Sequence, residues 1–253
     1  MVFSKRKTRQ VKARDQYPEE APYHKQAGKL RVLTRSEEPF RDREEAGQLL
    51  AQALLKWRGE GVVVLGIPRG GVVIADEIAM TLNADLDIVF AHKLGAPENP
   101  ELAIGAVTEN GAVYLNEAIT SRLIILPEYI IAEKERQLSN IKQRSALFRQ
   151  LRPKVPLKDK IVIVTDDGVA TGATLQAALW SARLEGPKKL IAAVPVGPEE
   201  TLRRLSHDAD DVVCLRVPAY LMAIGQFYVR FKQVEDSEVL EILKRSAKKE
   251  EQP

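Results

Sequence analysis

Short, continuously apolar runs rich in β-branched residues recur along this sequence. The first is Val62-Val63-Val64-Leu65-Gly66-Ile67, and such a run is typical of a strand buried on both faces of a parallel sheet. Similar runs follow at residues 87–91, 161–165, 190–194 and 211–217. Apolar positions with helical spacing lie at residues 43–57, where Asp42 is a candidate N-cap, and at 73–82, 175–184 and 199–205. Strands and helices that alternate in this way predict an α/β, doubly wound, mainly parallel sheet.

One segment interrupts this alternation. Residues 93–150 lie between two predicted core strands and contain two alternating runs, at 103–108 and 112–115. These runs are joined near Asn110-Gly111, a dipeptide that strongly predicts a hairpin. The segment ends in a long polar helix predicted at 128–148. Because a connection of this size in a compact domain is more often a lid or an interaction element than a passive link, we expect a lid insertion over residues 93–150.

The length and charge distribution suggest a division of the chain. The 253 residues are 45% hydrophobic and 29% charged, as in a globular protein with a real core. Residues 1–14 contain six basic side chains and no acid, although the whole chain has a formal net charge of only +3. We therefore expect a basic, flexible N-terminal arm over residues 1–36, with an electrostatic contact to RNA as the alternative role. The main domain is predicted over residues 37–253, with a small C-terminal hood and helix at 218–246; the helix is expected to begin at Asp236.

The cysteine count and the hydropathy of the sequence indicate the cellular compartment in which the protein is expected. The one cysteine, Cys214, cannot form an internal disulfide or a cysteine zinc cluster, which is typical of a reducing environment. The most apolar stretch, residues 61–80, is interrupted by proline and by charged residues, and no secretory signal pattern is present. We expect a cytoplasmic protein with no membrane contact.

The sharpest chemical motif follows the predicted strand at 161–165 and reads Asp166-Asp167-Gly168-Val169-Ala170-Thr171-Gly172-Ala173-Thr174. Backbone N–H groups at the start of the next helix, with the hydroxyls of Thr171 and Thr174, can surround a phosphate, and Gly172 allows the main chain to approach it closely. The carboxylates of Asp166 and Asp167 can accept hydrogen bonds from two neighbouring hydroxyls. A phosphate site next to a diol clamp predicts a ribose 5-phosphate site.

Two further elements follow other predicted strands. Gly66-Ile67-Pro68-Arg69-Gly70-Gly71 combines close backbone approach with an arginine that suits an anion, although a tight strand-to-helix turn is the alternative. His92-Lys93 is expected at the end of the second core strand, where Lys93 is either an anion contact or an exposed lysine. His92 and His207 are interpreted as structural, because neither belongs to a set with metal-ligand spacing.

The segment at residues 161–174 resembles the phosphoribosyl pyrophosphate signature of the type I phosphoribosyltransferases. The order of motifs at 39–43, 66–71, 101–106 and 227–228 is similar to that of an uncharacterised phosphoribosyltransferase-like branch, over roughly residues 38–243. The resemblance implies an enzyme of nucleotide metabolism that transfers ribose 5-phosphate from phosphoribosyl pyrophosphate to a nucleobase or another nucleophile and releases pyrophosphate. It also implies Mg²⁺, held mainly by ligand and water. We further expect a homo-oligomer.

The same resemblance implies a role for individual residues. It assigns the ribose hydroxyls to Asp166 and Asp167, which would reach Mg²⁺ only through water. It assigns catalytic roles to Arg69, Lys93, Asp166 and Asp167, with Arg69 and Lys93 on the pyrophosphate. The implied contacts to phosphoribosyl pyrophosphate are Pro68, Gly70, Gly71, Gly168, Val169, Ala170, Thr171, Gly172, Ala173 and Thr174. Several family members have a cis peptide in the pyrophosphate loop, which directs attention to the Pro68–Arg69 bond.

The acceptor is less well defined. Purine-salvage members carry an aspartate where this chain has Ala170, and alanine cannot move a proton, so an anionic, orotate-like acceptor or an unfamiliar nucleophile is favoured over hypoxanthine or guanine. Phe227 and Tyr228 either line an acceptor hood or pack the C-terminal segment. The alternative to an enzyme is a non-catalytic regulatory protein that senses phosphoribosyl pyrophosphate and binds RNA or a protein partner.

Overall fold

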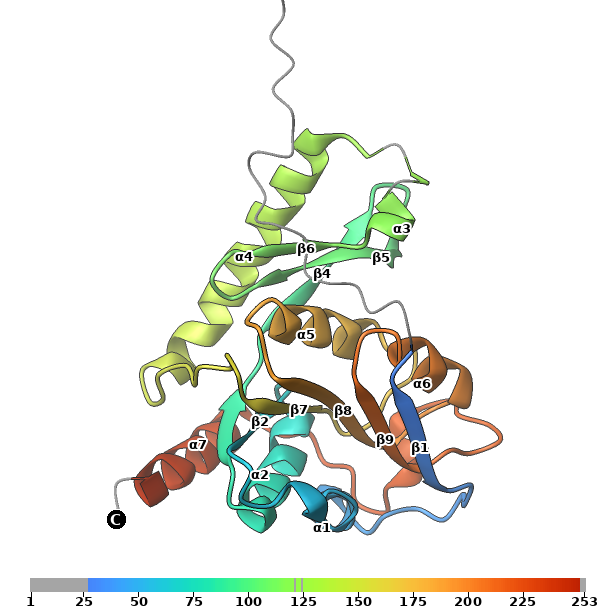
Figure 1. Cartoon of the computed structure of the whole chain (residues 1–253), viewed down its shortest axis with the longest axis vertical. Helices are drawn as coiled ribbons and strands as arrows, with labels where there is room; N and C mark the ends of the chain where they lie inside the picture. The colour runs from blue at the N-terminus through green and yellow to red at the C-terminus, as the bar shows by residue number, and fades with distance from the viewer. Residues whose placement is uncertain (1–26, 121, 124, 251–253) are drawn as a thin grey trace, which may run out of the picture.

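The protein is built around a six-stranded parallel sheet with the strand order β1-β9-β8-β7-β2-β3 (Figure 1). The structure, a computed structural model, describes residues 27–120, 122–123 and 125–250. The strands are β1 Lys29–Thr34, β2 Val62–Gly66, β3 Asp85–Ile88, β7 Ile161–Thr165, β8 Lys189–Val196 and β9 Asp211–Arg216. The predicted α/β fold with a mainly parallel sheet is confirmed.

Helices cover both faces of this sheet, which explains the continuous apolar runs. In β2, Val62 and Val64 pack with the helices on one face, whereas Val63 and Leu65 pack with those on the other. The first face carries α1 Arg43–Ala53, α2 Gly70–Leu82 and α7 Asp236–Glu250, and the second carries α5 Ala173–Arg183 and α6 Glu199–Leu205. Every residue of β2 and β7 is buried. Because both faces of these strands pack against helices, their sequences do not alternate between apolar and polar residues.

Helix α1 begins as its sequence predicts. The side chain of Asp42 accepts a hydrogen bond from the backbone N–H of Glu45 at 3.1 Å, which satisfies one donor of the first turn. The helix ends earlier than expected, because residues 55–57 form the separate 3₁₀ turn η2 Leu55–Trp57. No helix among the described residues is long and apolar enough to cross a lipid bilayer.

The predicted N-terminal arm is wrong in its last part. Residues 29–34 form β1, which pairs in parallel with β9 from Lys29 opposite Asp211 to Thr34 opposite Arg216. Only alternate positions of this edge strand turn inward, and they are half-buried, so no apolar run marks it. The rest of the arm, residues 1–26, lies outside the described residues, and so does its proposed contact with RNA.

The insertion forms a second, antiparallel sheet with the strand order β4-β5-β6, followed by two helices. Its elements are β4 Ala91–Ala96, β5 Asn99–Thr108, β6 Val113–Leu115, α3 Glu117–Thr120 and α4 Pro127–Arg149. The predicted hairpin is confirmed, because the N–H of Thr108 donates to the carbonyl of Ala112 across the turn. His92 and Lys93, which we expected at the end of a core strand, instead lie in β4, because β3 ends at Ile88 and the chain passes into the second sheet.

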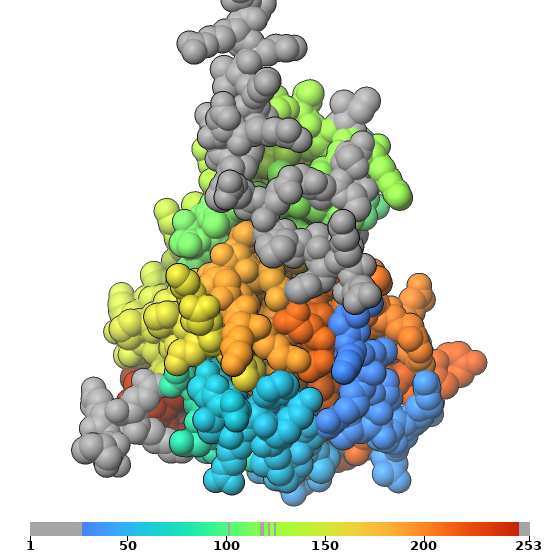
Figure 2. Space-filling view, in the orientation of Figure 1, coloured from blue at the N-terminus to red at the C-terminus, as the bar shows by residue number. Residues whose placement is uncertain are grey.

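The second sheet packs between α5 and α4. The ring of Tyr114 on β6 stacks on that of Trp180 on α5, with 4.6 Å between the ring centroids. On the other face, Ile141 and Phe148 of α4 are buried in the same apolar cluster as the strand residues Leu94 and Ile104. Figure 2 shows the green insertion lying above the orange surface of α5. The insertion is therefore seated on the second half of α5, and its action as a lid stays a prediction.

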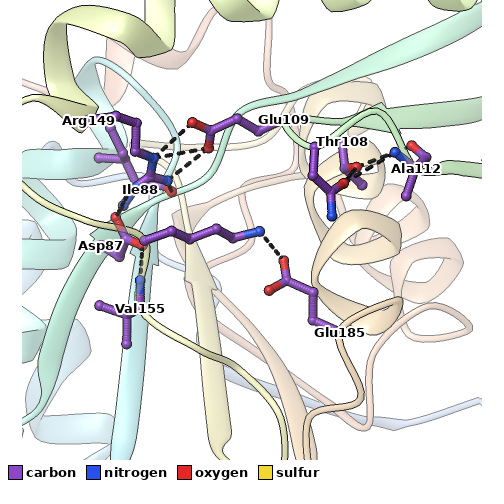
Figure 3. A network of polar contacts seen from close by, with 10 residues as sticks. Asp87, Ile88, Thr108, Glu109, Ala112, Arg149, Val155 and Glu185 are labelled. Carbon is purple, nitrogen blue, oxygen red and sulfur yellow. Dashed lines mark hydrogen bonds and ion pairs between the residues drawn. The ribbon is translucent and has the colours of Figure 1, made fainter.

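A buried ionic network fixes the insertion to the core sheet (Figure 3). Asp87 of β3 is 1% exposed, and its Oδ1 accepts a hydrogen bond of 2.6 Å from Nη1 of Arg149, the last residue of α4. Arg149 also pairs with Glu109, which follows β5, at 2.9 Å. The second oxygen of Asp87 accepts the N–H of Val155 at 2.9 Å. Both oxygens of the buried Asp87 carboxylate thus accept hydrogen bonds. The network joins the beginning and the end of the insertion to each other beside the core sheet.

Candidate functional site

The two predicted anion-binding loops lie side by side at the carboxyl end of the sheet. Strands β2 and β7 are neighbours, with Gly66 opposite Thr165, and the N–H of Ile67 donates to the carbonyl of Thr165 at 3.0 Å. The chain order reverses between these two strands, since β3 lies beyond β2 while β8 and β9 lie beyond β7. Ligands of doubly wound folds bind at such a reversal. The structure therefore brings residues 66–71 and 166–174 together as the sequence predicts.

Gly70 and Gly71 allow the first loop to touch the acid pair. A Cβ on Gly70 would overlap Oδ2 of Asp167 and would lie 2.9 Å from Nε of Arg43. A Cβ on Gly71 would lie 2.8 Å from the carbonyl oxygen of Thr165, which is closer than such contacts permit. Both glycines are therefore required by close packing. The peptide bond between Pro68 and Arg69, to which the resemblance directed attention, is cis.

The acid pair presents two carboxylate oxygens that no group of the described residues occupies. Oδ1 of Asp166 accepts the N–H of Asp167 at 2.9 Å, and Oδ2 of Asp167 accepts a hydrogen bond of 2.8 Å from Nε of Arg43. Nη2 of Arg43 lies 2.7 Å from the same oxygen, as the closest approach of this ion pair. Within the described part of the chain, Oδ2 of Asp166 and Oδ1 of Asp167 accept no hydrogen bond. One such oxygen on each of two adjacent residues is the set of acceptors that a vicinal diol requires.

The electrostatics of the pair are set by burial and by one arginine. Burial raises the pKa of the Asp166 carboxyl well above its usual range, and the neighbouring charge of Asp167 raises it further. The guanidinium of Arg43 acts in the opposite direction. Burial also raises the pKa of the Tyr228 hydroxyl, which remains a neutral donor and gives a hydrogen bond of 2.5 Å to the carbonyl of Asp167.

The phosphate loop, residues 168–174, is hydrogen-bonded to side chains of α6. The hydroxyl of Thr201 donates to the carbonyl of Ala170 at 2.8 Å, and the guanidinium of Arg204 donates to the carbonyl of Thr171. Gly172 is in the left-handed region, with φ at 77°, where it serves as N-cap of α5. The backbone N–H groups at the start of α5 have no partner within the helix, so this loop can bind an anion. Val169 is buried beneath the loop, whereas Ala170, Thr171 and Thr174 are exposed.

The two predicted cations have different surroundings. Arg69 is in the first loop, but its Nη1 lies 3.6 Å from a carboxylate oxygen of Glu235 and 3.9 Å from one of Asp236, at the start of α7. Lys93 belongs to β4 and is paired with Ala106 of β5 in the second sheet. Arg69 is thus in place next to the glycines, whereas Lys93 has a position in the fold that the sequence did not predict.

Arg43 and the C-terminal hood are the parts that sequence reasoning missed or left open. Arg43 is the first residue of α1, where a positive charge opposes the helix dipole, and that local conflict is a signal that could have identified it. Tyr228 and Phe227 are both packed, since Phe227 is 2% exposed and the ring of Tyr228 lies 5.5 Å from that of Phe40. The hood reaches the acid loop through Ile224, whose side chain fills the space beside Gly168.

Comparisons with known proteins agree with this geometry. A model of the phosphoribosyl transferase domain family matches residues 43–227. Two proteins of Mycobacterium tuberculosis, from strains CDC 1551 / Oshkosh and H37Rv, are provisionally named phosphoribosyl transferases; each is 44% identical over 207 residues, which are 82% of this chain and 47% of the relative. The chain spans about half the length of these curated relatives. A crystal structure of a Thermus thermophilus protein is 44% identical, with a TM-score of 0.78, over 82% of this chain and 98% of that one.

Proposed function

This chain belongs to the phosphoribosyl transferase family, and from that premise we propose that it transfers ribose 5-phosphate from phosphoribosyl pyrophosphate to a nucleobase or another nucleophile and releases pyrophosphate. The observation that carries the proposal is the acid pair, with Oδ2 of Asp166 and Oδ1 of Asp167 available beside the phosphate loop. In this proposal the two oxygens accept the ribose hydroxyls, and the backbone of residues 171–174 binds the 5-phosphate.

The first loop is assigned to the pyrophosphate. Negative charge develops on the departing pyrophosphate as the bond to the anomeric carbon breaks, so a cation and backbone N–H groups directed at that position stabilise the transition state more than the ground state. Gly70 and Gly71 supply the close backbone approach, and Arg69 supplies the charge. Because Arg69 faces Glu235 and Asp236, its guanidinium must exchange these carboxylates for the pyrophosphate. We also propose that Lys93, which lies in β4, contacts the pyrophosphate.

The residues of this site fit a Mg²⁺ ion that arrives with the ligand. Mg²⁺ prefers oxygen ligands and keeps several waters, and the two available carboxylate oxygens of Asp166 and Asp167 suit contact through water. When bound, Mg²⁺ would neutralise charge on the pyrophosphate. The carboxylates themselves orient the ribose ring and support the positive charge that grows at the anomeric carbon.

The acceptor is proposed to meet the ribose beneath the hood. Ala170 is exposed on the loop and offers no proton-transfer group, which favours an anionic, orotate-like acceptor or another nucleophile that needs no base. We retain residues 93–150 as a proposed lid that excludes water, and the cytoplasmic location and homo-oligomer as predictions. Any closing motion would have to act against the network of Asp87, Arg149 and Glu109.

The test measures pyrophosphate release from phosphoribosyl pyrophosphate and Mg²⁺ with a panel of nucleobases and small nucleophiles, while calorimetry follows binding. We expect binding and release that depends on the acceptor, and we expect the pair Asp166→Asn and Asp167→Asn to lose most of the affinity. Binding without release across the panel would favour the regulatory alternative, which also predicts RNA binding that is lost when residues 1–14 are deleted. A wild-type protein that does not bind phosphoribosyl pyrophosphate would contradict the transferase and the sensor alike.

A further inference from the structure

One guanidinium connects three separate elements at the site. The side chain of Arg43 is 10% exposed; its Nε donates to Oδ2 of Asp167, and its Nη2 forms an ion pair with the same oxygen. Its Nη1 donates to the backbone carbonyl of Lys232 at 2.8 Å, and its guanidinium carbon lies 3.9 Å from the centre of the Phe231 ring. Arg43 therefore joins the start of α1, the acid pair after β7 and the C-terminal hood.

The position of this arginine in its helix is unfavourable for the helix alone. Arg43 is the first residue of α1, where the positive end of the helix dipole disfavours a cation. Two acids, Glu44 and Glu45, follow in the same turn, as that dipole prefers. The positive charge of Arg43 is compensated by the carboxylate of Asp167, 124 residues away in the sequence. We take this as an indication that the site, and not the helix, requires an arginine at position 43.

The carboxylate of Asp167 is held on several sides. Arg43 engages Oδ2 with a charge-assisted hydrogen bond from Nε and an ion-pair contact from Nη2, and such charged contacts are stronger than neutral hydrogen bonds. The backbone of Gly70 closes the space beside this ion pair, and the main chain of Asp167 is bonded through its N–H to Asp166 and through its carbonyl to Tyr228. A carboxylate fixed in this way presents its other oxygen, Oδ1, in one orientation.

We infer that Arg43 is a positioning residue for the acid pair: it fixes the Asp167 carboxylate so that Oδ1 faces the ribose hydroxyl, and it ties that carboxylate to the hood. The inference rests on the proposed function, because it names the residue that prepares the clamp for phosphoribosyl pyrophosphate. Arg43 acts through Asp167, so its effect on binding must depend on the Asp167 carboxylate. It also implies that displacing the hood loosens the clamp, since Lys232 and Phe231 hold the same guanidinium.

The first measurement is the calorimetric affinity for phosphoribosyl pyrophosphate with Mg²⁺. We expect Arg43→Gln to bind at least about tenfold more weakly than wild type, because the half-buried carboxylate of Asp167 loses its charged partner. Arg43→Lys should fall between the two, since it keeps the charge but not the planar pair of donors. The matched control is Arg41→Gln, two residues earlier and exposed, where we expect a change below about twofold.

A double-mutant cycle separates positioning from general damage to the fold. In the Asp167→Asn background, Arg43→Gln should cost less than about threefold further affinity, because the partner through which it acts has gone. Equal losses in both backgrounds would overturn the inference, and so would wild-type affinity in Arg43→Gln. If Arg43→Gln does not fold, Arg43→Lys carries the same cycle. Failure of the wild-type protein to bind the ligand would instead refute the proposed function, and the inference with it.

Discussion

Gly70 and Asp167 approach so closely that a single methyl group between them would overlap the carboxylate oxygen bound by Arg43. The glycine lies in the loop after β2, and the aspartate lies in the loop after β7. Their contact packs the two anion-binding loops directly against each other.

The first prediction concerns Gly70→Ala. The added methyl group should displace the Asp167 carboxylate from Arg43 and weaken binding of phosphoribosyl pyrophosphate by about tenfold, as expected for a lost charged hydrogen bond. Calorimetry with Mg²⁺ measures this affinity. Gly186→Ala serves as the control, because Gly186 has φ at 67° and no atom within 4 Å of an added Cβ. That variant should lower the melting temperature and leave the affinity unchanged; unaltered binding by Gly70→Ala would show that the contact is not needed.

A second prediction follows from the raised pKa of Asp166. Burial, and then the charge of Asp167, make the folded protein hold the Asp166 proton more tightly than the unfolded chain does. Stability that depends on this group is therefore lost as the pH rises from the ordinary aspartate range through the raised pKa. We expect Asp166→Asn to raise the melting temperature at neutral pH, with a smaller gain below about pH 3, where the carboxyl is largely protonated in both states.

Thermal unfolding of Asp166→Asn and wild type across this pH range tests the point. Glu37→Gln, which alters an exposed acid, should follow the wild-type profile. A variant that is no more stable than wild type at neutral pH would show that ionised Asp166 carries no cost in the folded protein.

The third prediction concerns the acids that face Arg69. Glu235→Gln combined with Asp236→Asn should tighten binding of inorganic pyrophosphate with Mg²⁺, because the guanidinium no longer has to exchange a partner. Since each exposed ion pair is worth about 0.2–1 kcal/mol and two are removed, the gain should be no more than about thirtyfold. Glu238→Gln, an exposed change in the next part of α7, is the control. Weaker pyrophosphate binding in the double variant would mean that these acids assist the site.

A fourth prediction concerns the junction of the insertion. Arg149→Met removes the partner of Asp87, a carboxylate that is 1% exposed, and should destabilise the protein by about 3 kcal/mol. Denaturant unfolding measures the change. Lys154→Met, which breaks the half-exposed pair with Glu185, should cost less than about 1 kcal/mol. Similar small losses in both variants would show that Asp87 is not dependent on Arg149.

The parts of the fold that could be predicted are those with a local pattern. Buried strands such as β7 were predictable from continuous apolar runs, and the acid pair with its phosphate loop from residue type and order. Strand β1 was not predictable, because alternating half-buried and exposed positions give no such run. Arg43 was missed for a different reason: its role depends on a contact with Asp167 that only the folded chain creates.

The pairing of β1 with β9 has a consequence for how the chain folds. Lys29 of the first strand pairs with Asp211 of the last, so the edge of the sheet joins segments that lie far apart in the sequence. During synthesis, β1 leaves the ribosome long before β9 has been made. It therefore stays unpaired while the rest of the sheet forms. Contacts between such distant segments form late, because a long loop must close first. We thus expect the docking of β1 to be the last step of folding. In an incomplete chain the edge of the sheet would keep unpaired backbone groups exposed, where quality-control proteases could reach them.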